Sequence, residues 1–282
     1  MRYAVFTVSL PEYMPEQALS ELVDAGYDGV EWRVVDQQPA AEPGFWVGNR
    51  CTWPLSSFPE DAAHIRQLTE ASGLAMPNLG TYANSSDMAA VERAIVGASR
   101  LGVPQLRINV PPYNAKDSYI SMRDQALGQY ADVAALAKQY GVRALVEIHH
   151  NSLLPSASSA AAFLDRFDPQ YVGAIHDAGN MVYEGHEQYR MGLEVLGPYL
   201  AHVHLKNAQW KVIGTRPDGS TEWQATWAGI SKGIVDMHAL FRALRQIGYD
   251  GWLSFEDFST DVPLAQRLRD NIKYIRGVAE TI

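Results

Sequence analysis

Disulfides, membrane spans and basic surfaces are all missing from this sequence. Cys51 is the only cysteine among 282 residues, so no intramolecular disulfide can form. No stretch approaches the roughly 18 apolar residues of a membrane-spanning helix, and residues 1–13 lack the basic region and cleavage site of a secretory leader. The formal net charge of −9 argues against a nucleic-acid partner. We therefore expect a cytoplasmic protein that contacts neither a membrane nor nucleic acid.

What the sequence does contain is a regular alternation of short apolar runs and longer amphipathic ones. Hydrophobic residues make up 47% of the chain and charged residues 20%, which is typical of a globular protein with an ample core. The short runs predict strands at residues 3–9, 28–34, 74–80, 105–110, 143–149, 171–177, 201–206 and 252–257. The amphipathic runs predict helices at residues 15–26, 59–73, 87–102, 124–141, 157–167, 237–248 and 263–278.

Eight strands, each followed by a helix or by room for one, predict an α/β fold of the (β/α)8 TIM-barrel class, which typically takes about 250 residues. No linker or low-complexity tract divides the chain, so we expect a single domain over residues 1–282. A doubly wound open sheet is the alternative, but no strand is followed by its G-x-G-x-x-G turn. Long loops rich in Pro, Gly and Trp follow the second and seventh strands, at residues 35–58 and 207–234. In a barrel, both loops lie at the catalytic face.

Each of the last four predicted strands carries a group at its carboxyl end that can bind a metal. These residues are Glu147, Asp177, His204 and Glu256. In a barrel, such ends converge on one pocket. A single strand-end carboxylate more often caps the next helix, but four such groups on consecutive strands predict a shared site. Three carboxylates and one imidazole suit Mn²⁺ or Mg²⁺ better than Zn²⁺.

Five segments resemble motifs of the xylose isomerase-like TIM barrels, the sugar phosphate isomerase/epimerase superfamily. They are GYDGVEWR (26–33), VEIHHN (146–151), HDAGN (176–180), HVHLKN (202–207) and SFED (254–257). In relatives such as the ketose 3-epimerases, the matching positions bind one divalent metal. The resemblance therefore implies a metal, most commonly Mn²⁺ with Mg²⁺ or Co²⁺ as alternatives, held by Glu147, Asp177, His204 and Glu256. It also implies that Glu147 and Glu256 form the catalytic pair.

These groups suit the abstraction of a proton next to a carbonyl. A divalent ion stabilises the developing enolate, and two carboxylates on opposite faces of the substrate can remove and return the proton. The predicted function is a metal-dependent sugar epimerase or isomerase that forms an enediolate from a small sugar or sugar-like ketone. The alternative is a lyase or dehydratase that eliminates a substituent from a keto-sugar, a keto-inositol or a 3-keto-glycoside. An abasic-site endonuclease needs additional histidines and a basic surface, and a non-catalytic sugar-binding barrel leaves the four ligands unexplained.

Further residues near the strand ends are candidates for substrate binding, although each also has an ordinary structural explanation, such as pairing with an acidic neighbour or packing at the rim. The candidates are His149, Asn180, Lys206, Arg216, Arg107 and Trp32. Asn180 departs from the family, because many epimerases carry His there and an amide carries no proton at neutral pH; this keeps the lyase in consideration. His202 shares the inward face of its strand with His204 and is either a neighbour of the metal site or a structural residue. Relatives are often dimers or tetramers, so a homo-oligomer is left open.

Overall fold

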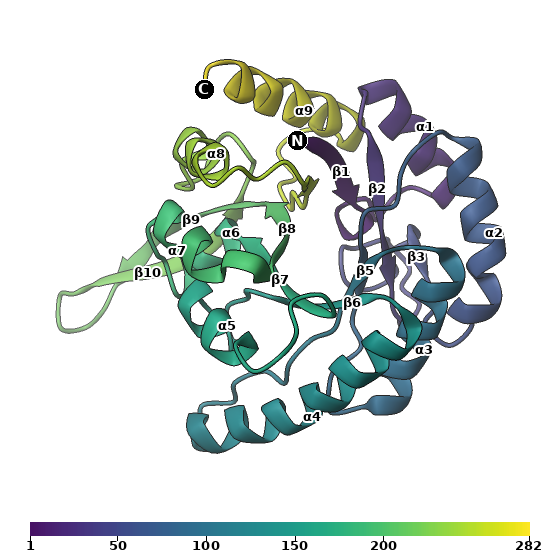
Figure 1. Cartoon of the computed structure of the whole chain (residues 1–282). Helices are drawn as coiled ribbons and strands as arrows, with labels where there is room; N and C mark the ends of the chain where they lie inside the picture. The colour runs from purple at the N-terminus through teal and green to yellow at the C-terminus, as the bar shows by residue number, and fades with distance from the viewer.

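Eight parallel strands close into a barrel with helices around it in the computed structural model, which describes residues 1–282 (Figure 1). The barrel strands are β1 (Arg2–Phe6), β2 (Gly29–Val34), β4 (Leu79–Thr81), β5 (Gln105–Arg107), β6 (Arg143–Glu147), β7 (Val172–Asp177), β8 (Leu200–Leu205) and β11 (Trp252–Phe255). The barrel closes because β1 pairs in parallel with β2 on one side and with β11 on the other. The predicted TIM-barrel class is confirmed.

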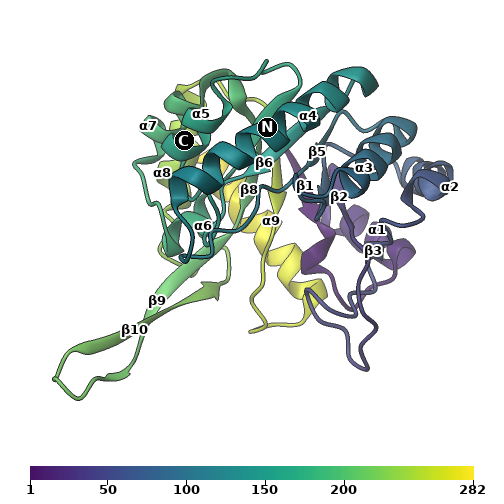
Figure 2. The same ribbon diagram turned by 90° about the horizontal axis from the view of Figure 1, so that it is seen from below.

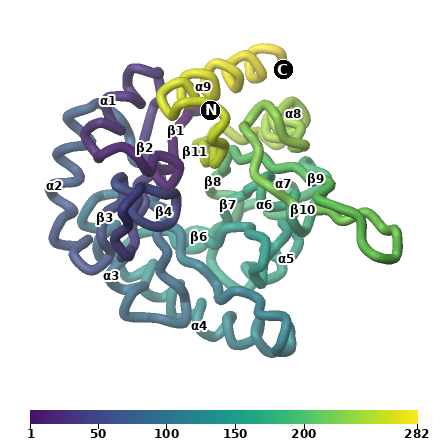
Figure 3. The backbone as a smooth tube through the Cα atoms, turned by 180° about the vertical axis from the view of Figure 1, so that it is seen from behind, coloured from purple at the N-terminus to yellow at the C-terminus, as the bar shows by residue number.

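Helices connect the strands and cover the outside of the barrel (Figures 1 and 3). They are α1 (Pro15–Ala25), α2 (Phe58–Ala71), α3 (Met88–Leu101), α4 (Tyr119–Tyr140), α5 (Ala157–Leu164), α6 (Ala178–Tyr183), α7 (Tyr189–Leu196), α8 (Met237–Gln246) and α9 (Leu264–Glu280). Their ends follow local signals: Pro15 lies in the first turn of α1, and Gly26 ends that helix in the left-handed conformation at φ 87°. Asp87 accepts a hydrogen bond from the Ala90 backbone N–H at the start of α3. None of these helices is long and apolar enough to cross a bilayer.

Alternation along the strands sorts the barrel residues into two layers. On β2, Trp32 points outward and is fully buried against α2, where its indole N–H donates to Thr69 Oγ1 at 3.1 Å. The preceding residue, Glu31, points inward toward β8. The main apolar core therefore lies between the strands and the helices, while polar and charged groups meet inside the barrel.

Several elements differ from the predicted pattern. Residues 207–234, predicted as a loop, contain the antiparallel hairpin of β9 (Asn207–Thr215) and β10 (Thr221–Ala228), which projects from the barrel as an arm (Figure 1). The short strand β3 (Thr52–Trp53) lies in the other long segment. The sequence pattern predicts no helix between β7 and β8, yet both α6 and α7 lie there. Helix α6 begins where the Asp177 carboxylate accepts the Asn180 backbone N–H at 2.8 Å.

The arm leaves the barrel at the same end as the long segment that follows β2 (Figure 2). Both follow the carboxyl ends of barrel strands, as β8 leads into β9 and β2 leads into residues 35–58. In a parallel barrel these ends all lie on one side, where functional groups collect. The predicted metal ligands occupy the same end.

Candidate metal centre

Four strand ends bring their metal-binding groups together. Glu147 and Asp177 are the last residues of β6 and β7. His204 lies one residue before the end of β8, and Glu256 directly follows β11. One donor atom from each lies within 4.8 Å of the others, and all four residues are buried. The Nδ1 atom of His204 is 3.3 Å from Glu147 Oε1, 3.8 Å from Glu256 Oε2 and 3.9 Å from Asp177 Oδ2.

The chemistry of this donor set fits one divalent cation. Four buried carboxylates meet here, those of Glu147, Asp177, Glu256 and the neighbouring Glu31, while Arg107 and Lys206 are the two permanent cations that pair with them. The carboxylates outnumber these two cations. Although burial lowers the pKa of His204, Glu31 and Glu147 outweigh it and hold that pKa well above its usual value, so the site attracts positive charge. Asp177 Oδ2 and Glu256 Oε2 are both buried and share a single permanent cation, the ammonium of Lys206. An oxygen-rich set of this kind suits Mg²⁺ or Mn²⁺.

Arg107 and Lys206 contact different carboxylates of the centre. Arg107 forms an ion pair with Glu147 through Nη1, and its Nε donates to the Thr81 carbonyl at 3.0 Å. Its Nη2 is buried and has no hydrogen-bond partner. Lys206 Nζ lies 2.8 Å from Asp177 Oδ2 and also pairs with Glu256. Arg107 therefore has one N–H group free to donate to an oxygen of a bound molecule. Lys206, by contrast, lies among the proposed metal ligands.

The two glutamates of the predicted catalytic pair differ in proton affinity. Burial raises the pKa of Glu256 to about 7, with Lys206 opposing the shift and the negative charge of Glu147 adding to it. Burial acts in the same direction on Glu147, but Arg107 and His204 outweigh it and hold the pKa of Glu147 well below its usual range. Glu256 therefore exchanges a proton near neutral pH more readily than Glu147.

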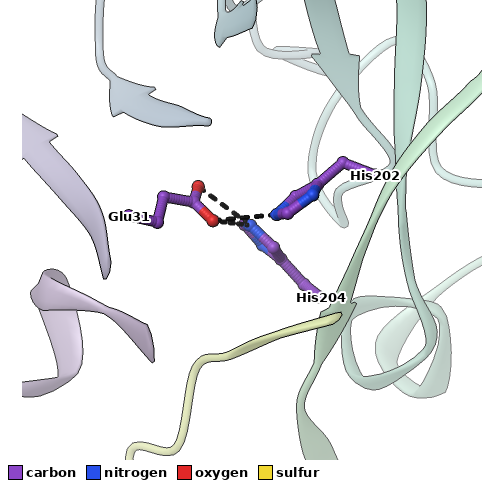
Figure 4. Close-up of side chains that lie close together, drawn as sticks. All are labelled: Glu31, His202 and His204. Atoms are coloured by element: carbon purple, nitrogen blue, oxygen red, sulfur yellow. Dashed lines mark hydrogen bonds and ion pairs between the residues drawn. The ribbon is translucent and has the colours of Figure 1, made fainter. Parts of the chain in front are cut away.

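Glu31 joins this centre although the strand-end pattern of the sequence does not reveal it. It reaches from β2 across the barrel interior toward β8 (Figure 4). Its carboxylate accepts hydrogen bonds from His202 Nε2 at 2.9 Å and His204 Nε2 at 3.1 Å. The Asn78 side-chain amide donates a third at 2.8 Å. The segment GYDGVEWR does contain a signal for an inward-facing Glu31, because side chains alternate along a strand and Glu31 is next to Trp32.

Two adjoining cavities of about 370 Å³ each lie at the carboxyl end of the barrel. Residues common to both linings are Tyr82, Arg107, His149 and His150. The first cavity reaches Glu147 and is mainly polar, with Asn84, Asn109, Asn151 and Ser152. The second reaches Glu256 and Lys206 and is largely aromatic, with Trp46, Tyr183, Trp227 and Phe258. Aromatic rings and a few polar groups in one hollow are typical of a small-molecule site.

Three of the six predicted substrate-binding residues line these cavities. Arg107 and His149 line both cavities, and Lys206 lines the second. The Nδ1–H of His149 donates to the His150 carbonyl at 2.7 Å, because a carbonyl oxygen only accepts. Burial lowers the pKa of His149, so the ring is neutral and its Nε2 is free to accept a hydrogen bond.

The other three predicted residues are not among those that line the two cavities. Trp32 faces α2 because it alternates with Glu31 along β2. Arg216 lies at the turn of the exposed arm and donates to the Thr221 carbonyl at 2.9 Å. Asn180 is fully buried, and its amide donates to Glu147 Oε1 at 3.3 Å, so it contacts a proposed ligand rather than the cavity.

Comparison with known proteins yields one family and two kinds of relative. The family model of the xylose isomerase-like TIM barrel matches residues 19–278. An inosose dehydratase of Geobacillus thermodenitrificans is 27% identical over 129 residues, covering 43% of this chain and 42% of that protein, so less than half of its length is matched. The inosose dehydratase of Serratia proteamaculans is 23% identical over 299 residues, covering 94% of this chain and 89% of that protein.

Solved structures resemble this chain over nearly its whole length. The 3-keto-D-glucoside 4-epimerase YcjR from E. coli gives a TM-score of 0.72 at 16% identity, covering 98% of this chain and 99% of that one. The IolI protein with a bound zinc atom gives a TM-score of 0.75 at 15% identity, covering 100% of this chain and 99% of that one. At these identities the likeness establishes the fold alone.

Proposed function

The chain belongs to the xylose isomerase-like TIM barrel family, and from this premise we propose that it is a metal-dependent epimerase or isomerase of a sugar or sugar-like ketone. The observation that carries the proposal is the convergence of Glu147, Asp177, His204 and Glu256 at cavities lined by polar and aromatic groups. These four residues would hold Mn²⁺, with Mg²⁺ or Co²⁺ as alternatives. When bound, the ion supplies Lewis-acid stabilisation for the negative charge of an enediolate.

Glu256 is the proposed base that removes the proton next to the carbonyl. Its carboxylate lines the second cavity, where a substrate would lie, and a carboxylate within reach of that proton can act as a general base. Arg107 can orient the substrate, because its unpartnered Nη2 belongs to a residue that lines both cavities. An epimer would form if Glu147, which is ionised at rest, first took up a proton from solvent and then delivered it to the opposite face, while Glu256 released its own proton to solvent. Delivery of the proton by Glu256 to the neighbouring carbon would give an isomer.

A dehydratase is the second candidate, favoured by the two inosose dehydratase relatives. The presence of Asn180, where many epimerases carry His, also favours a dehydratase. Elimination begins with the same proton abstraction by Glu256. The protonated Glu256 then delivers that proton to a departing hydroxyl, so that water leaves and a carbon–carbon double bond forms. Both candidates therefore share their first step.

Incubation of the Mn²⁺-loaded protein with substrates in deuterated water tests this shared step and separates the outcomes. The substrates are free ketoses, a keto-inositol and a 3-keto-glycoside, and the products are followed by NMR and mass spectrometry. We expect deuterium on the carbon next to the carbonyl together with an epimer or isomer. Loss of water with a new double bond would assign the dehydratase instead. If none of these substrates exchanges deuterium or eliminates, the proposed function is wrong.

Single substitutions test the roles of the two glutamates. Glu256→Gln and Glu147→Gln should each reduce deuterium incorporation by about 100-fold or more, the usual contribution of a general acid or base. Their circular dichroism should remain that of the wild type. Glu222→Gln, on the exposed arm, is the matched control and should keep full activity. Full activity in both active-site variants would contradict the two-glutamate mechanism.

A further inference from the structure

His204 presents its two ring nitrogens to two different sets of groups. Nδ1 faces the three carboxylates of the proposed metal centre at 3.3 to 3.9 Å. Nε2 lies 3.1 Å and 3.2 Å from the two carboxylate oxygens of Glu31. A neutral imidazole carries its proton on one nitrogen and its lone pair on the other, and only the lone pair binds a metal. The position of this proton therefore decides whether His204 can act as a ligand through Nδ1.

Glu31 determines where that proton lies. A carboxylate only accepts hydrogen bonds, so an Nε2 lone pair facing Glu31 would set two acceptors against each other in a fully buried place. Nδ1 also faces a carboxylate, Glu147 Oε1 at 3.3 Å, so the two nitrogens differ once a cation is bound on the Nδ1 side. An Nε2–H group then donates to Glu31, and the lone pair on Nδ1 is available to the cation. We propose that Glu31 is a positioning residue that holds His204 in the tautomer whose Nδ1 binds the metal. This inference rests on the metal centre of the proposed function but not on the reaction that it catalyses.

Glu31 is itself oriented by donors that do not belong to the metal centre. His202 Nε2 donates to its Oε2 at 2.9 Å, and the Asn78 amide donates to its Oε1 at 2.8 Å. Glu31, His202 and Asn78 are all fully buried. The rings of His202 and His204 approach the Glu31 carboxylate together (Figure 4), and the Asn78 amide holds its Oε1. Hydrogen bonds of this kind behind a ligand fix its ring orientation and raise its basicity.

Glu31, His202 and His204 also have the composition of a small metal site, but their contacts favour the positioning role. The Asn78 amide points an N–H donor at Glu31 Oε1, and an N–H donor is not a ligand for a cation. Neither cavity reaches Glu31 or His202. The cluster is therefore a buried hydrogen-bonded group, separate from both cavities, that connects to the metal centre through His204.

The tautomer can be measured directly in the wild-type protein. Protein labelled with ¹⁵N-histidine is loaded with Zn²⁺, a diamagnetic probe, and long-range ¹H–¹⁵N correlation spectra distinguish the two ring nitrogens. His204→Gln identifies the His204 signals by their loss. We expect the His204 proton on Nε2 and none on Nδ1. A His204 that carries its proton on Nδ1 in the loaded protein would overturn the inference without any substitution at Glu31.

Substitution of Glu31 tests the consequence for metal affinity. We expect Glu31→Gln to weaken Mn²⁺ binding by about 10- to 100-fold, as for other residues behind a metal ligand, with chelator competition as the assay. Glu31→Asp keeps the negative charge on a shorter side chain and should bind Mn²⁺ more tightly than Glu31→Gln but less tightly than the wild type. Asn78→Ala removes one donor that orients Glu31 but leaves the bond between Glu31 and His204, so it should weaken Mn²⁺ binding less than Glu31→Gln does.

These outcomes separate the inference from the proposed function. Loss of Mn²⁺ binding in Glu147→Gln, together with wild-type affinity in Glu31→Gln, would overturn the role of Glu31 and leave the metal centre intact. Absence of Mn²⁺ binding in the wild type would overturn both. If Glu31→Gln does not fold, the affinity of Glu31→Asp and the wild-type tautomer decide the question: an Nδ1–H tautomer, or undiminished binding in Glu31→Asp, would contradict the inference.

Discussion

Among single residues, Lys206 contacts the proposed metal centre directly, because its ammonium pairs with Asp177 and Glu256, two of the four proposed ligands. It also lies 5.1 Å from the centre of the Trp227 ring, a distance at which cation–π attraction operates. A metal ion that binds these two carboxylates would therefore compete with the Lys206 ammonium for them. The ammonium would keep its cation–π contact with Trp227.

We expect Lys206→Met to bind Mn²⁺ about tenfold more tightly than the wild type, equivalent to about 1.4 kcal/mol, because the competing cation is gone. The metal-free variant should be less stable, because two buried carboxylates lose their partner. Chelator competition measures the first effect, and urea unfolding in EDTA measures the second. Lys232→Met removes an exposed ion pair with Asp261 and is the control, with little change in either. Weaker Mn²⁺ binding in Lys206→Met would contradict this account.

The sequence predicts the four proposed ligands but not Glu31, and the reason is sequence distance. Each ligand ends its own strand, so a local pattern repeated once per β/α unit reveals it. The hydrogen bond from His202 to Glu31 joins residues 171 positions apart, and no local pattern reports such a contact. Trp32 lies on the outer face of β2, against α2, because neighbouring residues along a strand point to opposite faces.

At the scale of elements, α2 and α3 pack closely because Gly97 has no side chain. A Cβ atom at Gly97 of α3 would overlap the ring of Phe58 on α2. We expect Gly97→Ala to lower the free energy of unfolding by about 1–3 kcal/mol, as overpacking does. Gly128→Ala on exposed α4 is the matched control, because no atom lies within 4 Å of the added carbon. It should be stabilising by about 0.4–1 kcal/mol. Urea unfolding measures both, and equal stability of the two variants would refute the packing argument.

Element boundaries were predictable where one residue sets them, as Pro15 and Gly26 do for α1. The arm was not predicted, although Asp218 and Gly219 form a turn sequence between its strands and Gly219 has φ 85°. Its residues are mostly exposed, so the hairpin lacks the buried face that gives a strand its usual apolar pattern. Helix α6 was missed because its signal is the capping of a short helix by Asp177, not an amphipathic period.

For the molecule as a whole, the barrel interior gathers more carboxylates than permanently charged cations. Four buried carboxylates meet there with two permanent cations, and the whole chain already carries a formal charge of −9. Their strands come from both halves of the chain, since Glu31 lies on β2 and Glu256 follows β11. An ion bound at this point therefore links segments that are remote in sequence, and its binding energy is available only to the folded state.

Metal removal should accordingly lower the stability of the entire chain. At a free Mn²⁺ concentration 100 times the dissociation constant, binding adds about 2.7 kcal/mol to the free energy of unfolding. For a chain of this size, that corresponds to a rise in Tm of roughly 5–10 °C over the EDTA-treated protein. Scanning calorimetry measures the difference. Glu147→Gln, which removes a ligand charge, should show little or no Mn²⁺-dependent shift. A wild-type Tm that is the same in Mn²⁺ and in EDTA would mean that the four strand ends do not form a metal site.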